Sequence, residues 1–253
     1  MHNDIFTIGP ITIHGYGLMI GIGVIIALGV VLFRARKQGI ETDQVYSMVF
    51  VSLIFGLLGA KILYCIIEWN TLIIDPWAVV VGSGFVVYGG IIGGIIAAIV
   101  FAKIKALNFL KLFDLIIPEV AIAQGFGRLG CLLAGCCYGR QTDSSLGIMF
   151  HNSDLAPNDV NLIPTQIIFS ICAFALAIFL IAVSKYIKID GVVGALYVVL
   201  YSAGRFFLEY LRGDYRGTIF NVLSTSQFIA IIVFIIGICF YGLLKFRKQI
   251  EVK

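Results

Sequence analysis

A stretch of small, sulfur-containing and basic residues holds the side chains best suited to chemistry. It runs from 125 to 140, contains several glycines and three cysteines, and centres on Arg128 next to Gly127. It follows an apolar run, where a membrane helix is expected to end. An arginine at bilayer depth costs roughly 3 kcal/mol or more unless it is paired or faces a cavity. Because glycines let a ligand or another backbone come close, we interpret this stretch as a polar pocket in a membrane protein.

A second set of polar side chains lies on one face of a later apolar run. Arg205 and Glu209 are four residues apart, and Tyr201 and Arg212 extend the same helical face. An internal ion pair is one explanation. Arg128, however, has no acid nearby in its own run, so the two arginines carry more positive charge than the one close acid can neutralise. The planar guanidinium suits a phosphate, and a phosphate at this depth belongs to a phospholipid, so we predict a lipid head-group site.

The cysteines of the first stretch, Cys131, Cys136 and Cys137, are candidates for a disulfide or for reactive thiols on an oxidising outer side. A zinc site usually takes four ligands in paired spacings, and only His151 is near enough to supplement these three. We therefore predict no bound metal and no cofactor.

A Tyr-Gly-Gly sequence opens the third apolar run. Gly89 and Gly90 follow Tyr88 near the expected outer surface, where they either pack helices closely or let a ligand approach. Tyr88 is either an aromatic of the membrane interface or part of the site. Tyr16 begins the first apolar run at the same expected level. We place these four residues in the predicted site.

The elements that must position these groups are membrane helices. The chain has 253 residues, of which 60% are hydrophobic and 13% charged, too apolar for a soluble domain. We predict an all-α, polytopic integral membrane protein with one domain, 1–253. Its seven predicted spans are 14–33, 45–67, 85–102, 115–137, 162–184, 191–211 and 225–244. The net charge of +4 follows from topology and gives no reason to expect a nucleic-acid partner.

The basic residues predict the orientation. With the C-terminus inside, twelve of the eighteen lysines and arginines lie in inner segments and three in outer segments. Cytoplasmic loops carry the excess of positive charge, so the N-terminus and the 138–161 loop are expected outside. Lys61, Arg128 and Arg205 then share the outer half of the membrane, which predicts one outward-facing site.

Taken together, these residues resemble the motifs of the prolipoprotein diacylglyceryl transferase family. The resemblance runs through nearly the whole chain, at residues 16–19, 59–64 with 68–69, 88–90, 127–140, 164–166 and 201–212. The chain is a divergent, cysteine-containing variant of that pattern. Tyr88 stands where the family has histidine, Cys131 replaces an asparagine and Cys136 a glutamate. Ile168 and Phe169 replace a tyrosine and a glutamate.

The resemblance implies an enzyme of the bacterial cytoplasmic membrane. Such an enzyme moves the diacylglyceryl group of phosphatidylglycerol onto the thiol of a lipobox cysteine in a prolipoprotein, at the outer face. By analogy, Arg128 and Arg205 hold the phosphate and Glu209 orients Arg205. Tyr88 is expected to position the head group or to assist proton transfer. Matched positions also predict substrate contacts at Tyr16, Gly89, Gly90, Gly127, Gly139, Arg140, Tyr201 and Arg212.

Two alternatives follow from the same residues. One is a related phospholipid-dependent transferase with a different acceptor, in which Cys131, Cys136 or Cys137 takes part. The other is a membrane protein that binds or moves lipid without bond chemistry.

Overall fold

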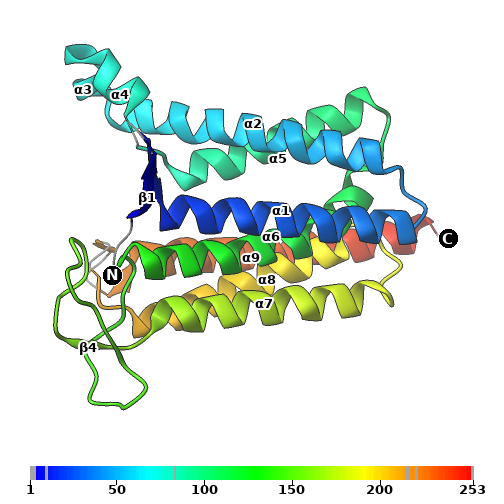
Figure 1. Ribbon diagram of the computed structural model, residues 1–253. Helices are drawn as coiled ribbons and strands as arrows, with labels where there is room; N and C mark the ends of the chain where they lie inside the picture. Colours follow the sequence, from blue (N-terminus) through cyan, green and yellow to red (C-terminus); the bar gives the residue numbers. More distant parts are fainter. Residues whose placement is uncertain (1–3, 9–10, 83, 215–216, 220–221, 252–253) are drawn as a thin grey trace. The chain divides into compact units, whose positions relative to one another are not determined.

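The computed structural model describes residues 4–8, 11–82, 84–214, 217–219 and 222–251 (Figure 1). Long helices dominate, since an apolar segment in lipid must satisfy its backbone hydrogen bonds internally. In chain order the elements are β1 (Asp4–Ile8), β2 (Ile11–His14), α1 (Gly15–Lys37), α2 (Thr42–Ile67), α3 (Trp69–Ile74), α4 (Pro76–Val81), α5 (Val87–Ile104), α6 (Phe109–Leu133), β3 (Ile148–Met149), β4 (Asn161–Leu162), α7 (Thr165–Ser184), α8 (Val192–Leu208), the 3-10 helix η1 (Glu209–Leu211), β5 (Thr218–Ile219), β6 (Leu223–Ser224) and α9 (Thr225–Glu251). The strands form three two-stranded antiparallel pairs, β1 with β2, β3 with β4 and β5 with β6.

Six helices are long and apolar enough to cross a membrane. They are α1, α2, α5, α7, α8 with η1, and α9, and they coincide with six of the seven predicted spans. The remaining predicted span, 115–137, overlaps α6, which carries Lys111, Asp114, Glu119 and Arg128. That α6 also crosses the membrane stays a prediction.

Large apolar side chains cover the outside of these helices. Ile25, Ile178, Phe207 and Ile236 are each more than half exposed. Exposing such side chains to water costs about 25 cal/mol per Å² of apolar surface, a cost that lipid tails remove. The protein is therefore a helical membrane protein.

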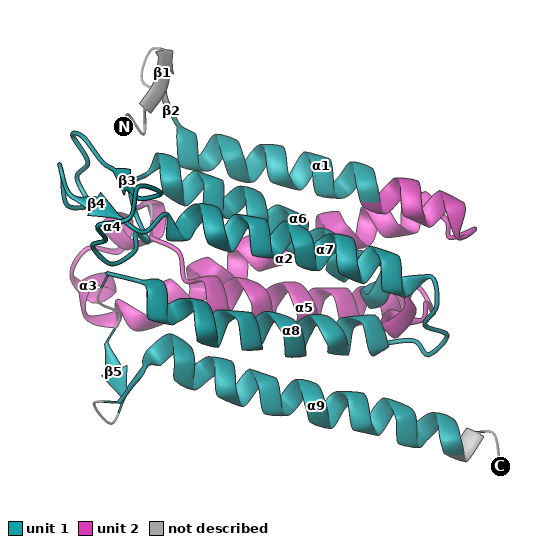
Figure 2. Cartoon of the chain, turned by 90° about the horizontal axis from the view of Figure 1, so that it is seen from below, with its two compact units in different colours: residues 1–30, 113–253 teal, residues 31–112 magenta. Residues whose placement is uncertain are grey.

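The chain divides into two compact units, residues 31–112 and residues 1–30 with 113–253 (Figure 2). In the unit of residues 31–112, α2 and α5 pack through glycines. A Cβ at Gly89 would collide with the Gly59 carbonyl, and one at Gly90 would lie 3.3 Å from the Gly56 carbonyl oxygen. Lys61 donates to the carbonyls of Gly82, at 2.6 Å, and Gly84, at 3.2 Å, so this partly buried amine has local partners.

The other unit is built on α6, α7, α8 and α9. Its core includes Ile117 and Ala121 of α6, Leu180 of α7, and Val193 and Tyr197 of α8. Figures 1 and 2 both show the end of α6, the start of α7, the end of α8 and the start of α9 at one end of this unit. That end carries most of the predicted site.

A carboxylate of α6 fixes the start of α8. The first N–H groups of a helix have no partner within it and form its positive pole. Here Gly191, at φ +91°, and Gly194 donate their N–H groups to the two Asp114 carboxylate oxygens, each at 2.7 Å. This contact joins residues about eighty positions apart and sets the axis of the helix that ends in Arg205.

Replacing Asp114 with alanine is expected to lower the free energy of unfolding by about 1–3 kcal/mol, because two backbone donors lose their acceptor. Asp114→Asn keeps one acceptor oxygen and should lose less. Denaturant unfolding in detergent micelles measures both. Asp43→Ala, at an exposed position in the first turn of α2, is the matched control and should change stability by about 0.5 kcal/mol or less. Equal losses at Asp114 and Asp43 would contradict this role.

Candidate active site

Helix α6 ends in a Schellman turn that brings two cysteines together. Gly135, at φ +67°, donates its N–H to the Leu132 carbonyl at 3.2 Å, and Cys136 donates to the Cys131 carbonyl at 3.1 Å. This motif places the side chains of its first and last residues, here Cys131 and Cys136, in contact. The prediction that the span continues to 137 is therefore wrong, because the left-handed glycine stops the helix after Leu133.

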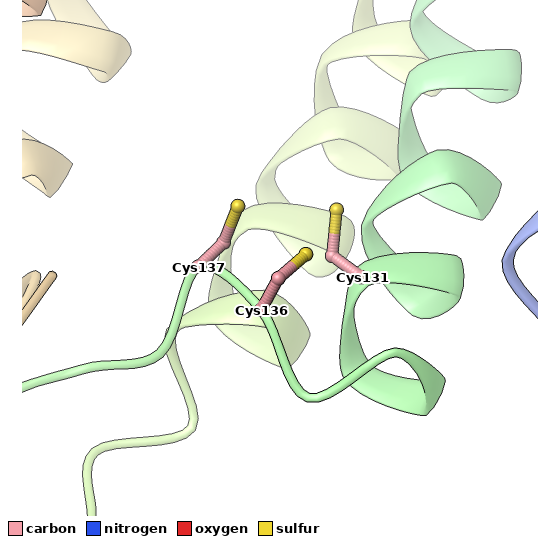
Figure 3. A group of neighbouring side chains, drawn as sticks. All are labelled: Cys131, Cys136 and Cys137. Atoms are coloured by element: carbon pink, nitrogen blue, oxygen red, sulfur yellow. The ribbon is translucent and has the colours of Figure 1, made fainter. Parts of the chain in front are cut away.

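The next residue adds a third thiol. Cys137 also has a positive φ, +61°, which turns its side chain back toward the other two. All three sulfur atoms lie within 4.8 Å of one another, and Figure 3 shows them gathered on one side of the turn. We call Cys131, Cys136 and Cys137 the thiol cluster. Among the residues that the structure describes, these three side chains form the group that could hold a metal ion.

The start of α7 holds this turn in place. The buried Gln166 side chain donates to the Cys136 carbonyl at 2.8 Å, and the Thr165 hydroxyl donates to the Cys137 carbonyl at 2.9 Å. These two residues belong to the 164–166 motif, whose structural task the sequence did not reveal.

Hydrogen bonding and charge set unequal acidities in the thiol cluster. Hydrogen bonds from the Cys131 and Cys136 thiols, with the neighbouring Arg212 charge, lower the pKa of Cys137 despite its burial. Hydrogen bonding to the other two sulfurs, with burial, raises the pKa of Cys136.

Arg128 and Arg205 come from different helices and meet at one aromatic ring. The guanidinium carbons lie 4.8 Å and 5.4 Å from the centroid of Phe169, on α7. Phe169 was noted in the sequence only as a departure from the family pattern. Both guanidinium groups therefore lie near one aromatic ring, and that they hold one phosphate stays a prediction.

Glu209 connects two of the arginines. It forms an ion pair with Arg205 one turn earlier and lies 3.8 Å from Nε of Arg212. The side chains of Arg205, Glu209 and Arg212 are only 13%, 6% and 2% exposed. Arg212 also holds Asp214 in a bidentate pair, with distances of 2.9 Å and 2.6 Å. The i, i+4 spacing predicted the first pair, whereas Asp214 was missed.

Residues at the start of α9 also bind to the ion-pair network around Glu209. Ser224 and Gln227 form a capping box, in which the Ser224 N–H donates to Oε1 of Gln227 and the Gln227 N–H donates to Ser224 Oγ. Ser224 Oγ also contacts Glu209 at 3.3 Å, and Nη2 of Arg205 donates to Ser226 Oγ at 2.9 Å. The Ser-x-x-Gln spacing was a usable sequence signal for this helix start.

Gly139 and Arg140 pair with the segment that carries Arg212. Gly139 forms an antiparallel bridge with Arg212, and Nε of Arg140 donates to the Arg212 carbonyl at 3.2 Å. A Cβ at Gly139 would collide with the Ile163 carbonyl, so a glycine is needed there. These contacts position Arg212. Direct substrate contacts of Gly139 and Arg140 stay predictions.

Three glycines leave open space beside the site residues. Among the described residues, nothing lies within 4 Å of a Cβ built at Gly17, Gly127 or Gly204. They are the chain neighbours of Tyr16, Arg128 and Arg205. Tyr16 packs on Gly130 and interacts electrostatically with Arg128 and the thiol cluster. Tyr201 stacks on Tyr197 and interacts electrostatically with Arg205.

The remaining predicted residues lie in the unit of residues 31–112. Tyr88 is half exposed in the first turn of α5, and Gly89 and Gly90 pack against α2. The packing explanation accounts for both glycines. A contact of these three residues with substrate stays a prediction.

The charges of the site do not cancel. Among the described residues, Arg205 and Arg212 are paired with Glu209 and Asp214, while Arg128 has no carboxylate partner and contacts an aromatic ring. The three guanidinium groups thus exceed the two carboxylates by one charge. Fold and site together define a helical membrane protein whose buried basic groups gather at one end of a helical unit.

Comparison with known proteins identifies the family. The family model described as prolipoprotein diacylglyceryl transferase matches residues 3–243. A Clostridium tetani protein named phosphatidylglycerol–prolipoprotein diacylglyceryl transferase is 45% identical over 246 residues, covering 97% of this chain and 98% of the relative. Clostridium perfringens has a protein of this name, numbered 2, with 46% identity over 241 residues, 94% of each chain. A Dehalococcoides mccartyi protein of the same name is 30% identical over 251 residues, 97% and 94% of the two chains. The chain belongs to the prolipoprotein diacylglyceryl transferase family.

Proposed function

We propose that this chain transfers the diacylglyceryl group of phosphatidylglycerol to the thiol of the lipobox cysteine in a prolipoprotein. Family membership and the names of relatives that match nearly the whole chain support the reaction. The apolar helices support a site that receives its lipid from the membrane. The enzyme acts at the outer face of the bacterial cytoplasmic membrane.

One observation carries the role of the site. Arg128 and Arg205 contact the same ring, and Arg128 has no carboxylate partner among the described residues. An anion placed between them gains two charge-assisted sets of hydrogen bonds, and guanidinium groups suit phosphate oxygens well. The phosphate of a lipid head group is such an anion. The open space beside Gly127 and Gly204 gives it room to approach.

The chemistry needs a stabilised leaving group. The acceptor sulfur forms a bond to the terminal glyceryl carbon, and the bond from that carbon to the phosphate oxygen breaks. The electron pair of the broken bond goes to the phosphate oxygen, the proton lost by the acceptor thiol balances the added negative charge, and glycerol phosphate leaves. Negative charge grows on the departing oxygen, so Arg128 and Arg205 stabilise the transition state more than the bound lipid. Glu209 keeps Arg205 aimed by holding its guanidinium from one turn away.

The orientation of the chain fits this site. With the N-terminus outside and the C-terminus inside, the excess of lysine and arginine lies in inner segments. The 138–161 loop and the arginines of the site then lie toward the exterior, where a translocated prolipoprotein presents its cysteine.

Expression in cells depleted of their own transferase tests the proposal. We expect this chain to restore lipid modification of prolipoprotein, and purified protein with phosphatidylglycerol and a lipobox peptide to release glycerol phosphate. A folded, membrane-inserted protein that does neither would contradict the proposal. Lipid turnover that leaves an adduct on Cys131, Cys136 or Cys137 would favour a different acceptor.

A further inference from the structure

The thiol cluster has no part in the proposed transfer, yet its three side chains could together hold a metal ion. Its three sulfur atoms lie within 4.8 Å of one another, and none of these three cysteines forms a disulfide bond. They come from the last turn of α6 and from the two residues after Gly135. Figure 3 shows the three side chains pointing to the same side of the turn.

This spacing suits a three-coordinate metal ion. Metal–thiolate bonds are about 2.3 Å long, so a planar ion with three such bonds holds its sulfurs about 4.0 Å apart. The sulfurs of the thiol cluster reach that separation with movements below about 1 Å. Rotation about the Cα–Cβ bonds supplies such movements without a change in the backbone.

The number and type of ligands select the ion. Thiolates are soft ligands that favour monovalent copper, zinc and iron–sulfur clusters. Structural zinc and iron–sulfur clusters take four protein ligands, whereas the described group offers three. A monovalent copper ion is satisfied by three thiolates in a plane. The sequence prediction of no bound metal rested on the missing fourth ligand, which this ion does not need.

The backbone presents the three sulfurs before any ion binds. The Schellman turn fixes Cys131 against Cys136, and the positive φ of Cys137 holds its side chain on the same side. Gln166 and Thr165 bind the carbonyls of Cys136 and Cys137 from outside the turn. A ligand set held by such bonds loses little conformational entropy on binding.

Charge also favours the occupied state. Three thiolates around one monovalent ion carry a net charge of −2, which a buried site tolerates only beside cations. The Arg212 guanidinium lies next to Cys137, and Arg128 interacts with Cys131. These two guanidinium groups thus balance part of this charge.

We propose that Cys131, Cys136 and Cys137 form a binding site for a soft, monovalent metal ion of the copper(I) class. Binding replaces the protons of the thiols by three metal–sulfur bonds, releases these protons to solvent, and changes no oxidation state. The proposal rests on the thiol cluster alone and holds whichever acceptor the transfer reaction uses.

The test is an anaerobic titration of the reduced, detergent-solubilised protein with copper(I), in competition with a coloured copper(I) chelator. We expect one ion per chain, and X-ray absorption that shows three sulfur neighbours. Replacing any one of Cys131, Cys136 and Cys137 with serine should weaken binding by more than about 100-fold, since loss of a mere supporting contact costs 10- to 100-fold.

The matched control changes Cys65, Cys172 and Cys239 together to serine, because these cysteines belong to other apolar helices and are not members of the thiol cluster. This variant should bind copper(I) as the parent does. Circular dichroism and size-exclusion profiles establish that each variant is folded. Binding that survives loss of Cys137 in a folded protein, binding that is lost in the control, or an ion with a fourth nitrogen or oxygen neighbour would overturn the proposal.

Discussion

Arg128→Ala is expected to lower kcat/KM for phosphatidylglycerol by roughly 10²- to 10³-fold, the usual cost of removing one group that stabilises transition-state charge. Stability should change little, because the Arg128 side chain has no carboxylate partner among the described residues and lies over the Phe169 ring. Its removal therefore leaves no buried acid unpaired. Release of glycerol phosphate by the purified protein, as a function of lipid content in mixed micelles, gives the value.

Two further variants define the role of this side chain. Arg128→Lys keeps the charge but loses the planar fork, so activity should lie between that of the parent and that of alanine. Arg36→Ala is the matched control, since Arg36 is an exposed arginine near the end of α1. It should leave kcat/KM within about twofold, because surface substitutions away from a site have small effects. A fully active Arg128→Ala protein would remove this residue from the site.

Glu209→Gln is expected to lower the free energy of unfolding by about 3 kcal/mol or more. The Glu209 carboxylate is buried between Arg205 and Arg212, and losing one partner of a buried ion pair leaves uncompensated charge. Activity should fall as well, because Arg205 then keeps only Ser226 and the Phe169 ring to direct it. Denaturant unfolding in micelles measures the first effect and glycerol phosphate release the second.

An exposed acid provides the comparison for Glu209. Glu41→Gln removes the same charge just before α2, where the carboxylate contacts only the exposed Gln44 side chain. Its effect on stability should stay within about 0.5 kcal/mol. If Glu209→Gln were as mild as Glu41→Gln, the arginines would have other partners, and the network described around them would be wrong.

The sequence could predict the features that depend on local pattern. Long apolar runs predicted the long helices, with ends that differ from the observed ones by up to seven residues, because length and hydropathy decide which segments suit a bilayer. The spacing of Arg205 and Glu209 predicted their ion pair, because helical geometry places such residues on one face. The motifs also identified the family, which the family model confirms.

Contacts between residues far apart in the chain could not be predicted from local sequence pattern. Nothing local shows that Asp114 meets the start of α8, or that Gln166 binds the Cys136 carbonyl. Two signals were present but unused: Gly135 as a helix stop and the Ser-x-x-Gln capping box at Ser224. The proximity of the thiol cluster depends on the turn after α6, whose backbone angles the sequence does not specify.

A double-mutant cycle between Arg128 and Arg205 is the most direct test of whether both hold one head-group phosphate. Arg205→Lys is the suitable partner change, since it keeps a cation beside Glu209. The measurement is kcat/KM for Arg128→Ala, Arg205→Lys and the double variant. Groups that hold one phosphate are coupled. The fold-loss of kcat/KM in the double variant should therefore be smaller, by roughly fivefold or more, than the product of the two single fold-losses. Losses that simply multiply would mean that the two arginines act on separate partners.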